Sequence, residues 1–137
     1  MRRRNRLSFA RLRADESGAA ALEFALVSSA FITLIFGIVY FSIMLHTKTT
    51  LQWAVETTIR QAAIDASVTQ TQLTTILNGH LAGTNMPNAV VSYSVATVGT
   101  VQVATLTGSF NRTFTIPFVG TFNTTYSATA KTPQNES

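Results

Sequence analysis

Hydrophobic residues follow three successive patterns along this chain, and the first is an unbroken apolar run. From Phe24 to Leu45 no charged residue occurs, and most side chains are aliphatic or aromatic. At about 1.5 Å of rise per residue, a helix over this run is long enough to cross a hydrocarbon core of roughly 30 Å. Serine and threonine hydroxyls within it can donate to backbone carbonyls of the same helix. We therefore predict one transmembrane helix over residues 19–45.

The second pattern has the period of an amphipathic helix and predicts that the first helix continues beyond the membrane over residues 46–66. No Pro or Gly interrupts this segment. We place Trp53 in the core of the folded head rather than at the membrane interface. The predicted buried stripe consists of apolar or small residues at helical spacing: Leu51, Val55, Thr58, Ile59, Ala62, Ala63 and Ala66.

A short second helix is predicted next. The segment Ser67-Val-Thr-Gln70 matches a capping box, in which the first and fourth residues close the start of a helix. Leu73, Ile76 and Leu77 supply its apolar face, and the helix is expected to end before Gly79. Glycine, asparagine and proline residues between 79 and 88 indicate a loop, in which we place His80.

In the third pattern, apolar and polar residues alternate, as in half-buried strands. Breaks at Gly99, Gly108 and 117–120 divide the segment into three or four antiparallel strands. The predicted inward positions are Val91, Tyr93, Val95, Val101, Val103, Thr105, Phe110, Phe114, Ile116, Phe118, Phe122, Thr124, Tyr126 and Ala128. The predicted fold class is therefore α+β: a long N-terminal helix, a short second helix and a small antiparallel sheet packed on the long helix. The small α+β head spans residues 67–130, and residues 131–137 form a polar tail.

Charge adds an orientation to this picture. The whole chain has a net charge of +4, which resides in residues 1–18, whereas the remainder is neutral. A basic segment can bind nucleic acid or an anionic membrane, but its place directly before the apolar run favours a cytoplasmic anchor. Residues 1–18 are therefore predicted to be a cytoplasmic leader and the head to be extracytoplasmic, with the lipid bilayer and not nucleic acid as partner. The leader's basic residues are Arg2, Arg3, Arg4, Arg6, Arg11 and Arg13.

A cleaved secretory signal peptide is the main alternative for the apolar run. Such a peptide usually has a shorter apolar region and a small-residue cleavage site after it. No convincing site of that kind, followed by a polar start, comes after Leu45. The sequence therefore favours a helix that stays in the membrane.

The residue inventory argues against catalysis. The chain has no cysteine, which excludes disulfides and thiolate metal sites. His46 and His80 are the two histidines, and neither has a second ligand at a metal-binding spacing. Serine and threonine hydroxyls are abundant, but no nearby base and orienting acid complete a nucleophilic site. We predict that the protein is not an enzyme and that it binds no cofactor or metal.

The unusual residue is Glu23, a carboxylate one position before the apolar run. A carboxylate at the membrane edge is unfavourable, although the positive end of the helix offsets part of the cost. Taken alone, Glu23 is equally well explained as an acid at a helix start. The glycine at position 18 and the small residues 19–21 before it make the combination uncommon.

Gly18-x-x-x-x-Glu23-Phe24, with its arginine-rich leader and apolar helix, resembles the TadE-like pseudopilins of the tight-adherence (Flp) pilus, a type IV pilin-like system. The resemblance is specific over about residues 11–66 and general beyond. It implies a minor pilin of the bacterial inner membrane, cut by a prepilin peptidase between Gly18 and Ala19. Its implied partners are that peptidase, other pilin or pseudopilin subunits and the pilus assembly platform.

Cleavage at that position has a physical consequence. It would remove the basic leader and create an α-ammonium group at Ala19. Glu23 lies four residues later on the same helical face, so its carboxylate can pair with this ammonium or with that of a neighbouring subunit. We therefore assign Glu23 and Phe24 to assembly. The alternative is an unprocessed single-pass anchor that presents a small β-rich adhesive or partner-binding head.

Overall fold

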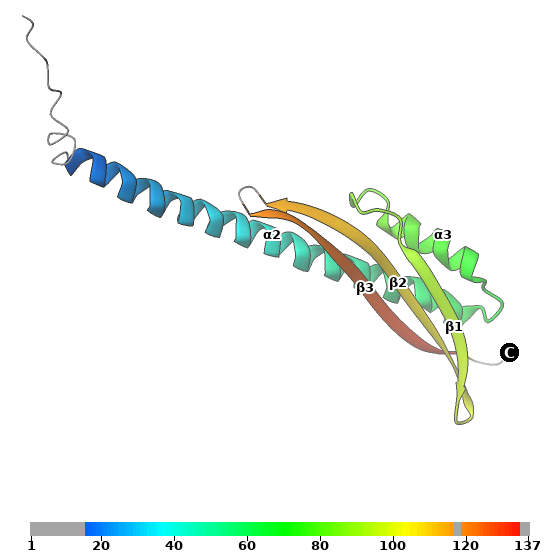
Figure 1. The fold of residues 1–137 in the computed structure, drawn as a ribbon. Coiled ribbons are helices and arrows are strands. Elements are labelled where there is room, and N and C mark those ends of the chain that lie inside the picture. The colour runs from blue at the N-terminus through cyan, green and yellow to red at the C-terminus, as the bar shows by residue number, and fades with distance from the viewer. Residues whose placement is uncertain (1–15, 117–118, 135–137) are drawn as a thin grey trace, which may run out of the picture. The chain divides into compact units, whose positions relative to one another are not determined.

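The computed structural model describes residues 16–116 and 119–134, which form two helices and three strands (Figure 1). The elements, in chain order, are α2 (Glu16–Ile64), α3 (Gln70–Leu81), β1 (Val90–Val98), β2 (Val101–Ile116) and β3 (Gly120–Gln134). The predicted α+β class is confirmed: a long apolar helix, a short helix and an antiparallel sheet packed on the long helix.

Helix α2 is continuous over 49 residues, as the absence of Pro and of helix-breaking pairs predicts. The chain divides into two compact units, the first ending at Tyr40 and the second beginning at Phe41. From here on, the head means this second unit, which is larger than the predicted head at residues 67–130. The helix ends at Ile64, two residues before the predicted end at Ala66. The cause is Asp65, whose Oδ1 accepts hydrogen bonds from Ser67 N (2.9 Å) and Ser67 Oγ (2.6 Å). This local turn competes with further helical hydrogen bonds.

The capping box of α3 exists, but it lies two residues later than predicted. Thr69 is the N-cap: its Oγ1 accepts from Gln72 N (3.3 Å), and Gln72 Oε1 accepts from Thr69 N (2.8 Å). Ser67 is engaged with Asp65 instead. The helix also continues through Gly79 to Leu81, so the predicted end is wrong. Nothing lies within 4 Å of a Cβ at Gly79, and the buried side chains that hold the last turns are Leu73, Leu77 and Leu81.

Two aromatic residues also differ from expectation. His80 belongs to the last turn of α3 and not to a loop. Its ring makes an edge-to-face contact with Trp53, with centroids 5.5 Å apart. Trp53 is 54% exposed, so its predicted place in the core is wrong. The pair covers the outside of the two helices, where an amphipathic ring tolerates solvent.

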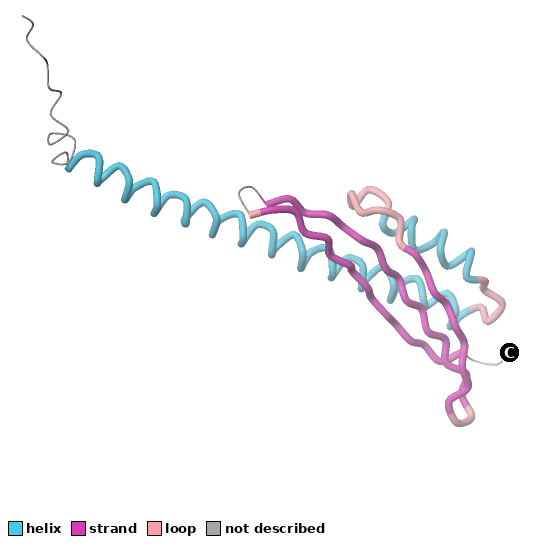
Figure 2. Tube along the Cα trace, viewed as in Figure 1, coloured by secondary structure: helices cyan, strands magenta, loops and turns pink. Residues whose placement is uncertain are grey.

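The sheet has the order β1-β2-β3, with β2 in the centre and antiparallel to both neighbours (Figure 2). Val98 pairs with Val101 across a two-residue turn, in which Gly99 has the positive φ that such turns require. Ile116 pairs with Gly120 at the other end of β2. Threonine and asparagine side chains of β2 and β3 form cross-strand hydrogen bonds on the exposed face, for example Thr107 with Thr129 at 2.9 Å.

Strand β2 runs unbroken through Gly108, where a break was predicted. Gly108 is required by packing: a Cβ there would lie 3.0 Å from Leu77 Cδ2 and 3.0 Å from Val55 Cγ2. Because side chains alternate along one strand, the even positions face the core throughout. The inward assignment of the odd positions Val101, Val103 and Thr105 is therefore wrong. The residues of β2 that are buried are Ala104, Leu106, Gly108, Phe110 and Phe114.

The core of the head lies between the sheet, α3 and the second half of α2. The predicted stripe on α2 is confirmed for its first five members, whereas Ala66 is exposed. Strand β3 extends to Gln134, four residues into the segment predicted to be a polar tail. Gln134 is buried, and its Nε2 donates to Ala62 O (3.1 Å) and Tyr93 Oη (2.9 Å). The core side chains are Leu51, Ala54, Val55, Ile59, Ala62, Leu73, Leu77, Leu81, Ala104, Leu106 and Phe110.

Candidate functional site

Gly18 lies near the start of α2, at a place where the fold does not need a glycine. No heavy atom lies within 4 Å of a Cβ built there, and its φ is not in the left-handed region. Glycine inside a helix lowers stability by about 0.5–1 kcal/mol relative to alanine. Gly37, further along the same helix, is equally unobstructed. The described chain therefore gives no internal reason for either residue.

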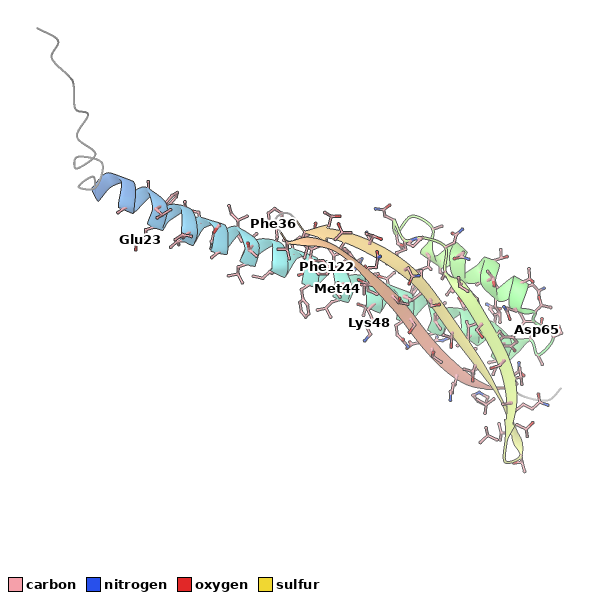
Figure 3. All side chains as sticks on the ribbon, in the orientation of Figure 1. Glu23, Phe36, Met44, Lys48, Asp65 and Phe122 are labelled. Atoms are coloured by element: carbon pink, nitrogen blue, oxygen red, sulfur yellow. The ribbon has the colours of Figure 1, made fainter. Side chains whose placement is uncertain are left out.

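Glu23 lies on the exposed surface of α2, among apolar side chains (Figure 3). Its neighbours Leu22 and Phe24 are 65% and 74% exposed. Ala19 lies one turn before Glu23 on the same face, because residues four apart are neighbours on a helix surface. Within the described residues, no hydrogen bond or ion pair engages the Glu23 carboxylate. The structure thus brings Ala19 and Glu23 to one face and leaves the acid available for a partner.

The apolar run around these residues has the properties of a membrane span. Helix α2 is long and apolar enough to cross a bilayer, and its most apolar window has no buried residues. Two hydroxyls bond back within the helix as predicted: Ser29 Oγ donates to Leu26 O, and Thr33 Oγ1 donates to Ser29 O, both at 2.9 Å. These bonds satisfy polar groups that lipid cannot satisfy.

The arginines of the predicted leader lie outside the described residues, so the structure leaves that part of the prediction untested. Among the residues it does describe, no group of three His, Cys, Asp or Glu side chains could hold a metal ion. The geometry of this segment therefore offers two features for recognition, an unobstructed glycine and an exposed acid in an apolar helix.

Residues 18–60 match the model of the TadE-like protein family. Over these residues the chain is similar to the TadE-like family. The match covers about a third of the chain and includes Gly18, Glu23 and Phe24. No curated protein and no solved structure gives a significant match. The TadE-like family consists of pilin-like proteins associated with the Tad pilus, and it is a structural family and not a catalytic one.

Sequence reasoning missed one feature that the TadE-like segment does not include. Phe122 of β3 occupies a position that the alternation assigns to the core, yet it is 47% exposed. Val119, in the turn before it, is 53% exposed. Alternation identifies which face of a strand a side chain occupies but not how far the layer beneath extends, so the sequence gives no signal for this exposure.

Proposed function

We propose that this protein is a pilin-like subunit of a tight-adherence pilus, cut between Gly18 and Ala19 by a prepilin peptidase and incorporated through α2. One observation carries the proposal: the family match falls on an exposed apolar helix whose Gly18 has no structural role, and whose Glu23 has no partner, among the described residues. Both features become explicable if peptidase and subunits act on them.

The cut and the acid are linked by charge. Hydrolysis of the Gly18–Ala19 bond leaves a carboxylate on the leader and an ammonium on Ala19. Between the apolar helices of packed subunits, an unpaired Glu23 carboxylate would be costly, and pairing with an ammonium offsets that cost. If the ammonium belongs to the neighbouring subunit, the pair also fixes the axial register of the two helices.

The same charges support the proposed orientation. Six arginines precede Gly18, whereas the residues after it have no net charge. Under the positive-inside rule, the leader is in the cytoplasm and the head is outside the inner membrane. The peptidase, the assembly platform and other pilin subunits would then meet α2 within the bilayer.

The test is the mass of the mature N-terminus in protein purified from its native host. We expect the chain to begin at Ala19, and an intact N-terminus beginning at Met1 would overturn the processing step. Gly18→Leu should leave full-length precursor on an immunoblot. Gly37→Leu is the matched control, since it also places a side chain on an unobstructed glycine of α2, and it should be processed normally. Equal processing of the two variants would remove Gly18 from the recognition site.

An unprocessed anchor with a binding head is the second candidate. One observation favours this anchor: hydroxyl and amide side chains on the exposed face of β2 and β3 form a row of cross-strand hydrogen bonds. In one of them, Thr113 Oγ1 donates to Asn123 Oδ1 at 2.6 Å. The same mass measurement separates the two, since an anchor keeps its arginine-rich end.

A further inference from the structure

The head has an exposed apolar surface at the end where α2 enters it. This hairpin-end surface consists of Phe41 (61% exposed), Met44 (38%) and Leu45 (53%) on α2, with Val119 (53%) and Phe122 (47%) from the β2–β3 hairpin. A groove of about 320 Å³ adjoins this surface, and it is lined by the three α2 residues, Lys48 and residues 124–127 of β3. Contiguous apolar surface of this kind marks a site that contacts a protein or a membrane.

Three contacts show how β2 and β3 lie along α2, with their hairpin toward the start of the helix. Gln134 at the end of β3 meets Ala62, Gly108 in the middle of β2 meets Val55, and Arg112 donates to Thr47 Oγ1 at 3.4 Å. From Arg112 to Ile116, the strand advances about another 13 Å. From Thr47 back to Phe41, the helix covers only about 9 Å. The hairpin therefore reaches at least as far along the helix as Phe41.

That level is where the apolar run of α2 ends. Phe41, Met44 and Leu45 belong to the last turns of the predicted span, 19–45. The hairpin that contains Val119 and Phe122 thus reaches the level of the last turns of this predicted span. Asp65 lies at the opposite end of the head from Met44 and Phe122 (Figure 3).

Two cations of the head lie next to this apolar surface. Lys48 borders the groove, and Arg112, held by Thr47, lies with its guanidinium 5.5 Å from the Phe114 ring centroid. The other charged residues described in the head lie further from the hairpin and include both signs: Glu56, Arg60, Asp65 and Lys131. A lipid leaflet has its acyl chains inside and its phosphates at the surface. An apolar surface followed directly by two cations has the matching order.

We propose that the hairpin-end surface rests on the outer leaflet of the bilayer that α2 spans, with Val119 and Phe122 among the acyl chains and with Lys48 and Arg112 at the lipid phosphates. The partner is lipid, because Phe41, Met44 and Leu45 of this surface belong to the predicted span itself and the two cations follow them. This inference rests on the membrane anchoring in the proposed function, and not on processing or pilus assembly. It makes the head a membrane-seated domain with two attachment points, the helix and the hairpin.

The test uses the full chain in vesicles of phosphatidylethanolamine and phosphatidylglycerol, with and without bromine on the acyl chains. Because the chain has no cysteine, single variants accept one fluorescent label each. Val119→Cys reports on the hairpin, and Phe122→Cys is a second probe of the same surface. Val98→Cys is the matched control, since Val98 is also an exposed valine beside a turn of β2, at the opposite end of that strand. Ala30→Cys, within the span, reports on insertion.

We expect brominated lipid to lower the emission from positions 119, 122 and 30 at least about twofold, since contact quenching requires a label in the hydrocarbon. Aqueous iodide should quench position 98 and spare the others. If position 30 is quenched by lipid while 119 and 122 behave like 98, the inference is wrong and the anchoring stands. If position 30 also escapes lipid, both are wrong. A third outcome is weak lipid quenching at position 119 together with protection from iodide that is lost when the protein is diluted in lipid. That result would assign the surface to contact with a second copy and overturn the proposal.

Discussion

The two halves of α2 contain the same kinds of side chain in opposite environments. Leu26, in the first half, is 64% exposed, whereas Leu51, in the second half, is completely buried. Both lie in one uninterrupted helix. Local sequence thus determines the helix, but burial depends on what else the chain supplies. The second half packs on its own sheet and α3, while the first half presents an apolar surface that nothing in the described chain covers.

This difference separates two kinds of functional constraint. In the head, packing within the chain explains the residue at a position, as the contacts with Leu77 and Val55 explain Gly108. In the first half, no contact within the described chain explains Gly18 or Glu23. Residues that the fold does not explain are the best candidates for recognition by other molecules.

The strongest test of this comparison neutralises one acid in each half of the helix, Glu23 and Glu56. Glu23→Gln removes the charge from the first half, and we expect processing to continue while incorporation into filaments falls. A broken buried pair costs about 3–5 kcal/mol, so the loss should exceed about a hundredfold. Glu56→Gln is the control, because Glu56 is exposed and accepts a hydrogen bond from Gln52 Nε2 at 2.7 Å within the head. Quantified pilus fractions from cells that express each variant provide the measurement. Equal incorporation of both would show that the Glu23 charge is not used in assembly.

Truncating one leucine in each half tests the packing side of the comparison. Leu51→Ala should destabilise the head by about 3–5 kcal/mol, because it leaves a cavity in a closed core. Leu26→Ala should change the stability of the head by less than about 0.5 kcal/mol, since its side chain has no core to leave. Thermal unfolding of the full chain in detergent micelles, followed by near-ultraviolet circular dichroism, measures both. Comparable losses would mean that the first half of α2 stabilises the head.

The helices, the strand types and the fold class were predictable because they depend on local periodicity. The errors arose where a local signal had two physical meanings. Gly108 was interpreted as a break, but glycine also permits close packing, and Val55 and Leu77 are brought against it only by the tertiary fold. That error divided β2 into two strands. Two separate strands can turn odd positions of one and even positions of the other toward the core, whereas a single strand keeps one alternation throughout. Val101 and Val103 were therefore assigned to the wrong face.

The candidate site divides in the same way. Gly18 and Glu23 could be found from sequence because an acid and a glycine are conspicuous beside an apolar run. The hairpin-end surface could not, because it combines residues near position 44 with residues near position 120. Phe122 occupies a strand position on the core-facing side of the sheet. It is exposed because the packing beneath the sheet ends before this position.

The smallest expected effect concerns two tyrosines of the head that differ in hydrogen bonding. Tyr93 Oη accepts from Gln134 Nε2, whereas the buried Tyr126 hydroxyl has no partner among the described residues. Tyr126→Phe should therefore raise the stability of the head by about 1 kcal/mol, and Tyr93→Phe should lower it by about as much.

Alkaline pH distinguishes the two tyrosine variants further. Burial raises the pKa of Tyr126 above its usual value, although the nearby Arg112 guanidinium opposes the shift. The unfolded chain therefore loses this proton first, and the wild-type head should lose stability as the pH rises above about 10, toward the raised pKa of the folded state. Tyr126→Phe should lack this loss, whereas Tyr93→Phe should retain it. Unfolding of the full chain in detergent micelles, compared at neutral pH and above pH 10, measures both effects. If the two variants lost stability together at neutral pH, the Tyr126 hydroxyl would have a partner within the head.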